Sequence, residues 1–495
     1  MIPLGFTALD TAIVLLYLVG MAIFGVLSGG RQTSARDYFL GSGTIPWWAA
    51  CFAIVATETS TLTFISIPAL AYAGNLNFLQ VTVGYLLGRI VVAWLLLPAY
   101  AQGQLATAYQ YLGGRFGPRL RSVASLTFMG TRVLADGVRL FATAIPLALL
   151  LKGWGSLPGV SDHTITLIAI LVMAGITLVY TFLGGVRAVI WTDVVQMFIY
   201  LGGAVGALLV IFNRLPPGAL SALPIEKFSV LNAGGGTAPL FTSPYTLAAS
   251  LAGGAFLSMA SHGTDQIIVQ RLLTVTSLSG SRKALVGSGV VVILQFALFL
   301  VIGVLLYAFY GGASLTALGL TKGDEIFPKF ILEMMPSGLS GLIIAGLLAA
   351  AMSTLSGSIN SLASTTIHDF YKPYFDRGLG EKRELLLSRL VSLAWCAVLV
   401  AVAFFFIATT SKVLVELALS IASVTYGGLL GAFLLGVLFP RVRERDAITG
   451  FAAGIATMAV VVFVTPIAWT WFTIIGTLTT VAVGTLTRTL FPPTA

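Results

Sequence analysis

The sequence predicts an all-α integral membrane protein. Of its 495 residues, 57% are hydrophobic and only 9% are charged, whereas an ordinary soluble domain has roughly 25% charged residues. Apolar stretches near the roughly 20 residues needed to cross a bilayer recur from end to end, and no long polar segment separates them. We therefore expect a single membrane domain, residues 1–495, with the lipid bilayer as its surroundings.

Hydropathy divides the chain into about 13 predicted transmembrane spans. They start near residues 8, 46, 78, 122, 163, 187, 244, 284, 337, 386, 412, 447 and 468. An odd number of spans places the two termini on opposite sides of the membrane. If the loop with Arg31 and Arg36 is cytoplasmic, far more Lys and Arg residues, Arg271 among them, fall in cytoplasmic loops than in outer loops. The positive-inside rule then predicts an outer N-terminus and a cytoplasmic C-terminus.

The net charge of +9 does not indicate a nucleic-acid partner, because the basic residues lie in short loops and form no polybasic arm. Cys51 and Cys396 both fall in apolar runs, where a free thiol behaves as a small hydrophobe. The first apolar run follows only Asp10 and lacks a basic n-region and a clear cleavage site, so it is expected to remain as a helix.

Two outer segments are long enough to cover an entrance. Residues 214–243 are rich in Pro and Gly, and a passive linker is the preferred interpretation, with a lid as the alternative. Residues 311–336 carry apolar side chains at helical spacing, which predicts a surface helix: Ile326, Phe330, Ile331 and Met334.

The second span contains an unusual run of hydroxyls and one carboxylate. Glu58 lies within residues 56–63, which read ATETSTLT. A charged group at mid-membrane costs several kcal/mol, so it is a functional candidate. The run is typical of a broken helix whose freed carbonyls and hydroxyls bind an ion or a solute. The alternative is that the hydroxyls bond back to their own helix.

The seventh span is the expected counterpart of this run. It carries Gly253 and Gly254, followed by Ser258, His262 and Asp265. A helix break at the two glycines would match the break in the second span, and paired interruptions indicate a binding site. Helix-packing glycines are the alternative interpretation.

The ninth span presents small and hydroxyl residues on one helical face: Ala350, Ser353, Thr354, Ser356 and Gly357. Hard cations prefer oxygen ligands, which the hydroxyls and the carbonyl of Ala350 offer without buried charge. A small-residue helix contact is the alternative. Asp193, in the sixth span, is expected to supply a negative charge for that cation, or else to pair with a neighbouring helix.

Further ionisable residues lie within spans. Arg132, Asp136 and Arg139 share one helical face, which favours a structural ion pair over solute binding. Arg89 has no local partner and is expected to pair across helices with Glu58 or Asp136. The lone His262 is expected to be a packed side chain, because no second ligand stands at metal-binding spacing, so no transition metal is predicted.

Several stretches, in this order along the chain, resemble the sodium:solute symporter family. These are Arg36-Asp37-Tyr38-Phe39, Tyr109-Gln110-Tyr111-Leu112 with Arg115-Phe116, Gly184-Gly185 through Trp191-Thr192-Asp193, Thr264-Asp265-Gln266 with Gln270-Arg271, and Ala350-Ala351-Met352-Ser353-Thr354. The family includes sodium-coupled sugar, proline, sialic acid, iodide and monocarboxylate carriers.

The resemblance implies a LeuT-type fold of two inverted five-helix repeats. The repeats correspond to residues 46–213 and 244–440, with one extra helix at 8–30 and two C-terminal helices at 447–490. It also implies a function: sodium-coupled symport of a small polar organic solute into the cell by alternating access. The protein would act as a monomer in the plasma membrane, with sodium as its coupling ion.

The resemblance implies up to two sodium sites in this chain. The principal site would use backbone oxygens near Ala56 and Thr59, the carbonyl of Ala350, and the hydroxyls of Ser353 and Thr354. A second site, found in some members, would use Asp193, Ser353, Ser356 and a further hydroxyl where this chain has Gly357. That departure weakens the prediction of a second ion.

The family's solute cavity maps onto a polar and aromatic set: Glu58, Ser60, Thr63, Phe78, Thr82 and Asp136. Residues 64–68 resemble members that bind sialic acid, but this chain has Thr82 and Ala135 where those members have a glutamine and an arginine. The solute class therefore stays open among sugars, amino acids, sialic acids and carboxylates. Glu58 would bind an ammonium group, accept sugar hydroxyls or bind a proton.

Three other functions remain as alternatives. A proton-coupled carrier that uses Glu58 is the nearest. A membrane-embedded enzyme is a more distant one, because no nucleophile with its base, no paired metal ligands and no phosphate-binding loop stands out in the sequence. A channel is the third, and saturable flux would exclude it.

Overall fold

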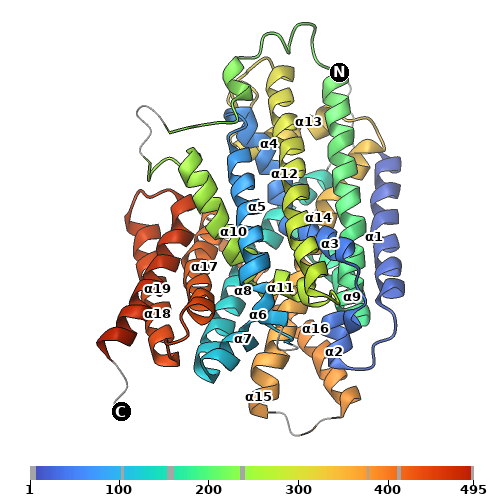
Figure 1. The fold of residues 1–495 in the computed structure, drawn as a ribbon. Helices are drawn as coiled ribbons and strands as arrows, with labels where there is room; N and C mark the ends of the chain where they lie inside the picture. Colours follow the sequence, from blue (N-terminus) through green and yellow to red (C-terminus); the bar gives the residue numbers. More distant parts are fainter. Residues whose placement is uncertain are drawn as a thin grey trace.

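The computed structural model describes residues 7–101, 105–152, 161–234, 240–375, 378, 380–409 and 414–491. Within these ranges the regular structure is helical, and the one β-type pairing is an isolated bridge between Ile45 and Val275. Figure 1 shows one helical bundle whose long helices run roughly along a common direction. The predicted all-α class is confirmed.

Eight helical stretches of the described chain are long and apolar enough to cross a membrane alone. They contain α1 (Ala8–Gly29), α5 (Phe78–Leu95), α9 (Asp162–Asn213), α12 (Leu278–Phe309), α14 (Leu339–Thr365), α16 (Glu381–Thr409), α18 (Glu444–Val464) and α19 (Phe472–Leu490). The pair α3 (Trp47–Glu58) and α4 (Thr61–Ala73), bent by 67°, forms a ninth. The protein is thus a multi-pass membrane protein.

The other helices of the described chain are shorter or less apolar. They are α2 (Ala35–Leu40), α6 (Leu97–Ala101), α7 (Ala108–Arg115), α8 (Pro118–Lys152), α10 (Gly254–Gly263), α11 (Gln266–Leu273), α13 (Ile326–Met334), α15 (Lys372–Phe375) and α17 (Leu414–Leu438). Short π or 3-10 turns flank them at Gly41–Gly43, Ile225–Phe228, Ala249–Gly253, Gly323–Glu325, Thr366–Tyr371 and Trp469–Trp471.

Each predicted span start lies within a few residues of the start of a helical segment. The start near residue 187 falls just after Gly185, the non-helical residue at which two helices meet in a kink within α9. Gly185 has a φ of 57°, and a Cβ there would lie 2.5 Å from the Tyr38 carbonyl oxygen. The backbone at this kink therefore requires a glycine.

The second predicted span is broken, as expected. Thr59 is extended, with φ −82° and ψ 106°, and ends α3. Ser60 begins α4 by a reciprocal capping box with Thr63, which satisfies the first N–H groups of the new helix. The hydroxyl run of the sequence therefore encodes a helix end followed at once by a helix start.

The seventh predicted span also breaks, but not at the glycines. Gly254 is helical, and a Cβ there would lie 2.6 Å from the Val81 carbonyl oxygen, so the glycine allows α10 to approach α5. The break lies instead at Thr264 and Asp265, where the Asp265 side chain caps α11. The predicted break at Gly253 and Gly254 is wrong, because those glycines serve helix packing.

Helix α14 lies at the centre of the bundle. Its apolar window is 94% buried, whereas the windows of the other spanning helices are between 33% and 61% buried. It packs against α9, α1, α8 and α16 and also touches α3 and α4. The small and hydroxyl residues of this helix are therefore surrounded by protein, not lipid.

The first described helix begins and the last one ends at opposite ends of the bundle. In Figure 1, α1 begins toward the top of the view, and α19 ends at the bottom left. Helix α1 packs on α9 and α14, and α18 and α19 pack on α17 at the far side. This arrangement agrees with an odd number of crossings.

The two segments that the sequence predicts to lie outside both contact the bundle. Residues 311–336 contain α13, which buries Ile326, Phe330 and Ile331, so the predicted surface helix is confirmed. The described part of 214–243 is also attached to the bundle. Lys227 donates to the carbonyl oxygens of Tyr72 at 2.6 Å and Gly74 at 2.8 Å, at the end of α4.

Candidate cation and solute site

The break between α3 and α4 frees backbone oxygens in the middle of the bundle. The Thr59 N–H still bonds the Val55 carbonyl oxygen at 3.1 Å. The next N–H, that of Ser60, bonds Thr63 Oγ1 at 3.4 Å instead of continuing the ladder. The Ala56 carbonyl is thus left without its helical donor, as expected at a helix end.

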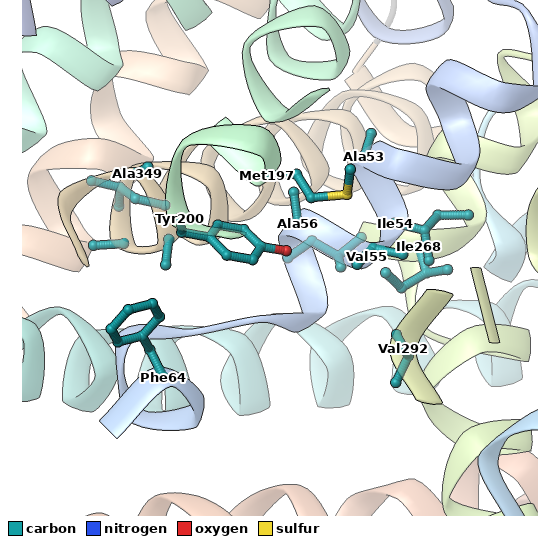
Figure 2. Packing of buried hydrophobic residues seen from close by; sticks show 14 of the residues in the cluster. Ala53, Ile54, Val55, Ala56, Phe64, Met197, Tyr200, Ile268, Val292 and Ala349 are labelled. Carbon is teal, nitrogen blue, oxygen red and sulfur yellow. The ribbon is translucent and has the colours of Figure 1, made fainter. Parts of the chain in front are cut away.

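Two neighbouring helices hold Thr59 at this break. Gln295 Nε2 of α12 donates to Thr59 Oγ1 at 2.6 Å, and the Tyr200 hydroxyl of α9 lies 3.3 Å from the same oxygen. Tyr200 also donates to Gln295 Oε1 at 3.1 Å. Figure 2 shows Tyr200 extending from α9 toward Ala56 at the end of α3. The network fixes the position of the break.

The predicted hydroxyls of α14 are buried and give their protons to other groups. Ser353 Oγ donates to Asp193 Oδ1 at 2.7 Å, and Thr354 Oγ1 donates to the Ala350 carbonyl oxygen at 3.1 Å. Ser353 is 0% exposed and Thr354 is 5% exposed. A hydroxyl whose proton is engaged still has lone pairs that can coordinate a cation.

Hydrogen bonds on both sides of the break join the broken helix to the helices of this site. Thr61 Oγ1 of α4 donates to the Leu347 carbonyl oxygen of α14 at 3.0 Å. Thr57 Oγ1 of α3 lies 3.4 Å from Asp193 Oδ2, the carboxylate that Ser353 also bonds. The oxygens at Ala56 and Thr59 are therefore carried by a segment that is tied to α14, and the donor set suits a hard monovalent cation.

Asp193 lies at the same junction but already has a cationic partner. Its side chain is 0% exposed, and Arg271 Nη2 donates to Oδ2 at 2.7 Å. Arg271 itself is 1% exposed on α11. Its assignment to a cytoplasmic loop is therefore wrong, because α11 continues into the bundle after the break at Asp265.

A second polar centre lies where α3, α5 and α10 meet. Glu58, the last residue of α3, forms an ion pair with Arg89 of α5, whose side chain is 0% exposed. Arg89 Nη1 also donates to Ser288 Oγ at 2.7 Å, and His262 Nε2 lies 3.5 Å from Glu58 Oε2. The predicted pairing of Arg89 with Glu58 is confirmed, and pairing with Asp136 is not observed.

This centre contains buried polar atoms without hydrogen-bond partners. Among the residues that the structure describes, they include Arg89 Nε, Ser258 Oγ and His262 Nε2. Ser258 and His262 are one turn apart on α10 and so share a face. Because a buried polar atom without a partner is costly, a ligand or water is expected to satisfy this group.

The other predicted solute residues lie on α4 and α5. The Ser60 and Thr63 hydroxyls are 3.3 Å apart within the cap of α4. Phe78 stacks on Phe296 with ring centroids 5.3 Å apart. Thr82 is 0% exposed, and its hydroxyl donates to the Leu79 carbonyl oxygen of its own helix.

Asp136 is placed in a separate ion-pair network. It accepts a hydrogen bond from Ser358 Oγ of α14 and lies 3.2 Å from Arg139 and 3.5 Å from Arg132. Arg132 also pairs with Asp265, the cap of α11. The ion pair expected on this face is present, and the hydrogen-bond and ion-pair partners of Asp136 do not include Glu58 or its partner Arg89.

Sequence reasoning missed Gln295, Tyr200 and the role of Arg271. Gln295 had a usable signal, because it is an isolated amide in the apolar run from Val290 to Leu300, where polar groups are expected to be functional. A tyrosine such as Tyr200 is common in apolar helices and gave none. Among the described residues, no cluster of three or more His, Cys, Asp or Glu is placed to hold a metal ion.

Comparisons with known proteins agree on one class. The model of the family described as "Sodium:solute symporter family" matches residues 38–454. The "Sodium/sialic acid symporter NanT" of Aliivibrio fischeri is 30% identical over 481 residues, covering 96% of this chain and 92% of the relative. The human "Sodium/iodide cotransporter" is 28% identical, covering 90% of this chain and 68% of the relative.

Solved structures show the same likeness. One is described as the substrate-bound outward-open state of a Na+-coupled sialic acid symporter that reveals a novel Na+ site; it superposes with a TM-score of 0.85 at 27% identity and covers 99% of both chains. MHP1, a nucleobase-cation-symport-1 family transporter, superposes with a TM-score of 0.55 at 16% identity over 94% of this chain and 96% of its own. The second match concerns the fold alone.

Proposed function

Because this chain belongs to the sodium:solute symporter family, we propose that it couples one sodium site, at the break between α3 and α4, to uptake of a small polar solute. Members of the family are transporters, so the alternative of a membrane-embedded enzyme is rejected. The proposal concerns which residues carry the ion and the solute. It rests above all on the buried hydroxyls of Ser353 and Thr354 on α14, the helix that packs against both halves of the broken span.

The sodium ligands would be the oxygens of Ala56, Thr59, Ala350, Ser353 and Thr354. Sodium prefers oxygen ligands, and carbonyls at an unwound helix supply them without a charged side chain. Asp193 accepts the proton of Ser353, so the Ser353 lone pairs are free for a cation. The Gln295 and Tyr200 contacts to Thr59 support this assignment, because they hold the broken segment in place.

The solute would lie against Glu58, Arg89 and the α10 face of Ser258 and His262. A carboxylate and a guanidinium side by side present both signs of charge, which suits a zwitterion or a neutral polyhydroxy solute. The relatives named as sialic acid symporters make a sugar acid one candidate. Thr82 and Ala135 offer neither the amide nor the guanidinium that the resemblance would require for it.

Alternating access follows from the position of the ion. Sodium that bridges the broken helix and α14 would favour the conformation in which those two elements are in contact. By linkage, a conformation favoured by sodium binds solute more tightly, and solute raises sodium affinity equally. The potential contributes about 2.3 kcal/mol per charge for each 100 mV.

The membrane arrangement is part of the same proposal. We place the N-terminus outside and the C-terminus in the cytoplasm of the cell membrane, from the distribution of Lys and Arg between the loops. The two inverted repeats would be residues 46–213 and 244–440. The broken pairs α3–α4 and α10–α11 open the two repeats, as that symmetry requires. A single chain contains every residue of the proposed sites, which supports function as a monomer.

A proton-coupled carrier is less well supported. Glu58 is the residue that would bind the proton, but it is paired with the fully buried Arg89, which favours a charged carboxylate in this conformation. A proton on Glu58 would leave a buried guanidinium without its partner. Uptake driven by an acid exterior without sodium would nevertheless decide for that alternative.

The experiment is uptake into vesicles that contain the purified protein. Thermal-shift screening against sugars, amino acids, sialic acids and carboxylates, with and without sodium, first identifies a solute. We then expect an inward sodium gradient to drive uptake and the double substitution Ser353→Ala with Thr354→Ala to abolish it. Uptake that does not depend on the sodium gradient, or that is unchanged in the double variant, would refute the proposal.

A further inference from the structure

The set of residues that the resemblance assigns to a second sodium ion is incomplete in this chain. Asp193 and Ser353 are bonded to each other at 2.7 Å, as such a site would need. Ser356 Oγ donates to the Ser353 carbonyl oxygen of its own helix at 3.0 Å and keeps its lone pairs. Gly357 has no side chain to offer. One of the four expected ligands is therefore missing.

A guanidinium lies where the fourth ligand would extend. A Cβ added to Gly357 would lie 2.8 Å from Arg271 Nη2 and 3.3 Å from Nη1. A side chain at residue 357 would therefore compete with Arg271 for the same space. The missing hydroxyl at residue 357 and the position of the Arg271 guanidinium are thus linked, because the guanidinium occupies the space that a side chain would need.

Arg271 is fixed at this position by two groups. Its Nη2 and Nε donate to Asp193 Oδ2 at 2.7 Å and 3.3 Å, and its Nη1 donates to the Ile267 carbonyl oxygen at 2.6 Å. Planar guanidinium groups suit such paired contacts with a carboxylate. A buried carboxylate needs one compensating cation, and Asp193 has it in Arg271.

We propose that Arg271 is a tethered replacement for the second sodium ion, and that this chain binds a single sodium ion. The proposal rests on the sodium coupling proposed above and adds its stoichiometry. Arg271 and a sodium ion carry the same charge, and two cations beside one buried carboxylate would repel each other. Residue 357 sets which of them occupies the site, because a side chain there would push the flexible end of Arg271 aside.

The experiment counts bound sodium with radioactive 22Na+ on the purified full-length protein, without solute. We expect one saturable ion per chain in the wild type. In Gly357→Ser, the new side chain displaces the flexible end of Arg271 and supplies the missing hydroxyl, so we expect two ions. Arg271→Gln removes the tethered cation and should also raise the count to two.

Matched measurements make the result decisive. Gly130→Ser, on α8 with nothing within 4 Å of its added Cβ, is the control and should bind one ion. Two ions in the wild type overturn the proposal, and this count needs no substitution to fold. A count that stays at one in both Gly357→Ser and Arg271→Gln also overturns it. Binding of no sodium at all would instead refute the sodium coupling itself.

Discussion

Arg89 of α5 forms an ion pair with Glu58 at the end of α3. The other polar contacts described for the two side chains, with Ser288 and His262, also come from other helices. The pair joins the broken helix to its neighbour just before the extended segment begins. Its energetic role differs from that of a surface ion pair, because the Arg89 side chain is fully buried. Removing one member leaves a buried charge, whereas removing both leaves none.

The first prediction is a strong coupling between these two residues. Glu58→Gln should reduce the free energy of unfolding by about 3–5 kcal/mol, because it leaves Arg89 unpaired in the bundle. Glu58→Gln with Arg89→Met should lose less than the sum of the two single substitutions. Denaturant unfolding of the purified protein measures the cycle, and additive effects would contradict the pairing.

An exposed pair provides the control for this cycle. Lys329 and Glu333 form an ion pair one turn apart on α13, with side chains 24% and 43% exposed. Their removal should change the free energy of unfolding by less than about 1 kcal/mol, as for other surface pairs. If the free energy of unfolding fell as much here as in Glu58→Gln, the unfolding assay would not distinguish a buried ion pair from an exposed one.

The sequence predicted this part of the site well. An ionised residue inside an apolar span is so costly that Glu58 and Arg89 had to have partners, and few partners were available. The run after Glu58 predicted a broken helix, because side-chain caps and freed carbonyls need hydroxyl residues there. What the sequence left open was the choice of partner, since helix neighbours depend on packing over the whole bundle.

The second prediction concerns Gln295, which holds Thr59 at 2.6 Å. Gln295→Leu keeps the volume but removes the donor to the Thr59 hydroxyl, so Thr59 is held less firmly at the break. We expect sodium affinity to fall by about 10-fold to 100-fold, as when a residue that orients a metal ligand is removed. Leu294→Ala, at a neighbouring residue that is 67% exposed, should leave sodium affinity unchanged. Equal affinities of the two variants would contradict the role of Gln295.

The third prediction tests the close approach of α5 and α10. A Cβ at Gly88 would lie 2.2 Å from the Ala255 carbonyl oxygen, which is backbone and cannot turn away. Gly88→Ala should therefore lower the free energy of unfolding by about 1–3 kcal/mol, despite the better helix propensity of alanine. Gly130→Ala, in open space, should be neutral or slightly stabilising. A neutral Gly88→Ala would show that the helices separate easily.

The rules that relate local sequence to helix breaks explain why the break in the seventh span was predicted at the wrong residues. Glycine pairs break some helices and pack others, and sequence alone does not distinguish the two at Gly253 and Gly254. The actual break at Asp265 carried a usable signal, because aspartate is a preferred N-cap residue. The error had a second consequence. Arg271 was assigned to a loop, although it lies in α11 and is buried in the bundle.

The fourth prediction concerns the outer segment. Lys227 is 8% exposed and donates to carbonyl oxygens at the end of α4, where a cation also complements the helix dipole. Lys227→Met should release the segment, so limited proteolysis between residues 214 and 234 should become faster in the variant. Lys322→Met, on the other outer segment, is the control. Unchanged cleavage in Lys227→Met would mean that other contacts fix the segment.

The most direct test of the central claim is the sodium-dependent rise in unfolding temperature of the purified protein, with choline replacing sodium at constant ionic strength. At sodium concentrations about 100 times the dissociation constant, binding should stabilise the wild type by about 2.7 kcal/mol. Ser361→Ala, which removes a buried hydroxyl that bonds only the Ser358 carbonyl oxygen of its own helix, should keep that rise. Ser353→Ala with Thr354→Ala should lose it. An undiminished rise in the double variant would contradict a sodium ion held between the broken helix and α14.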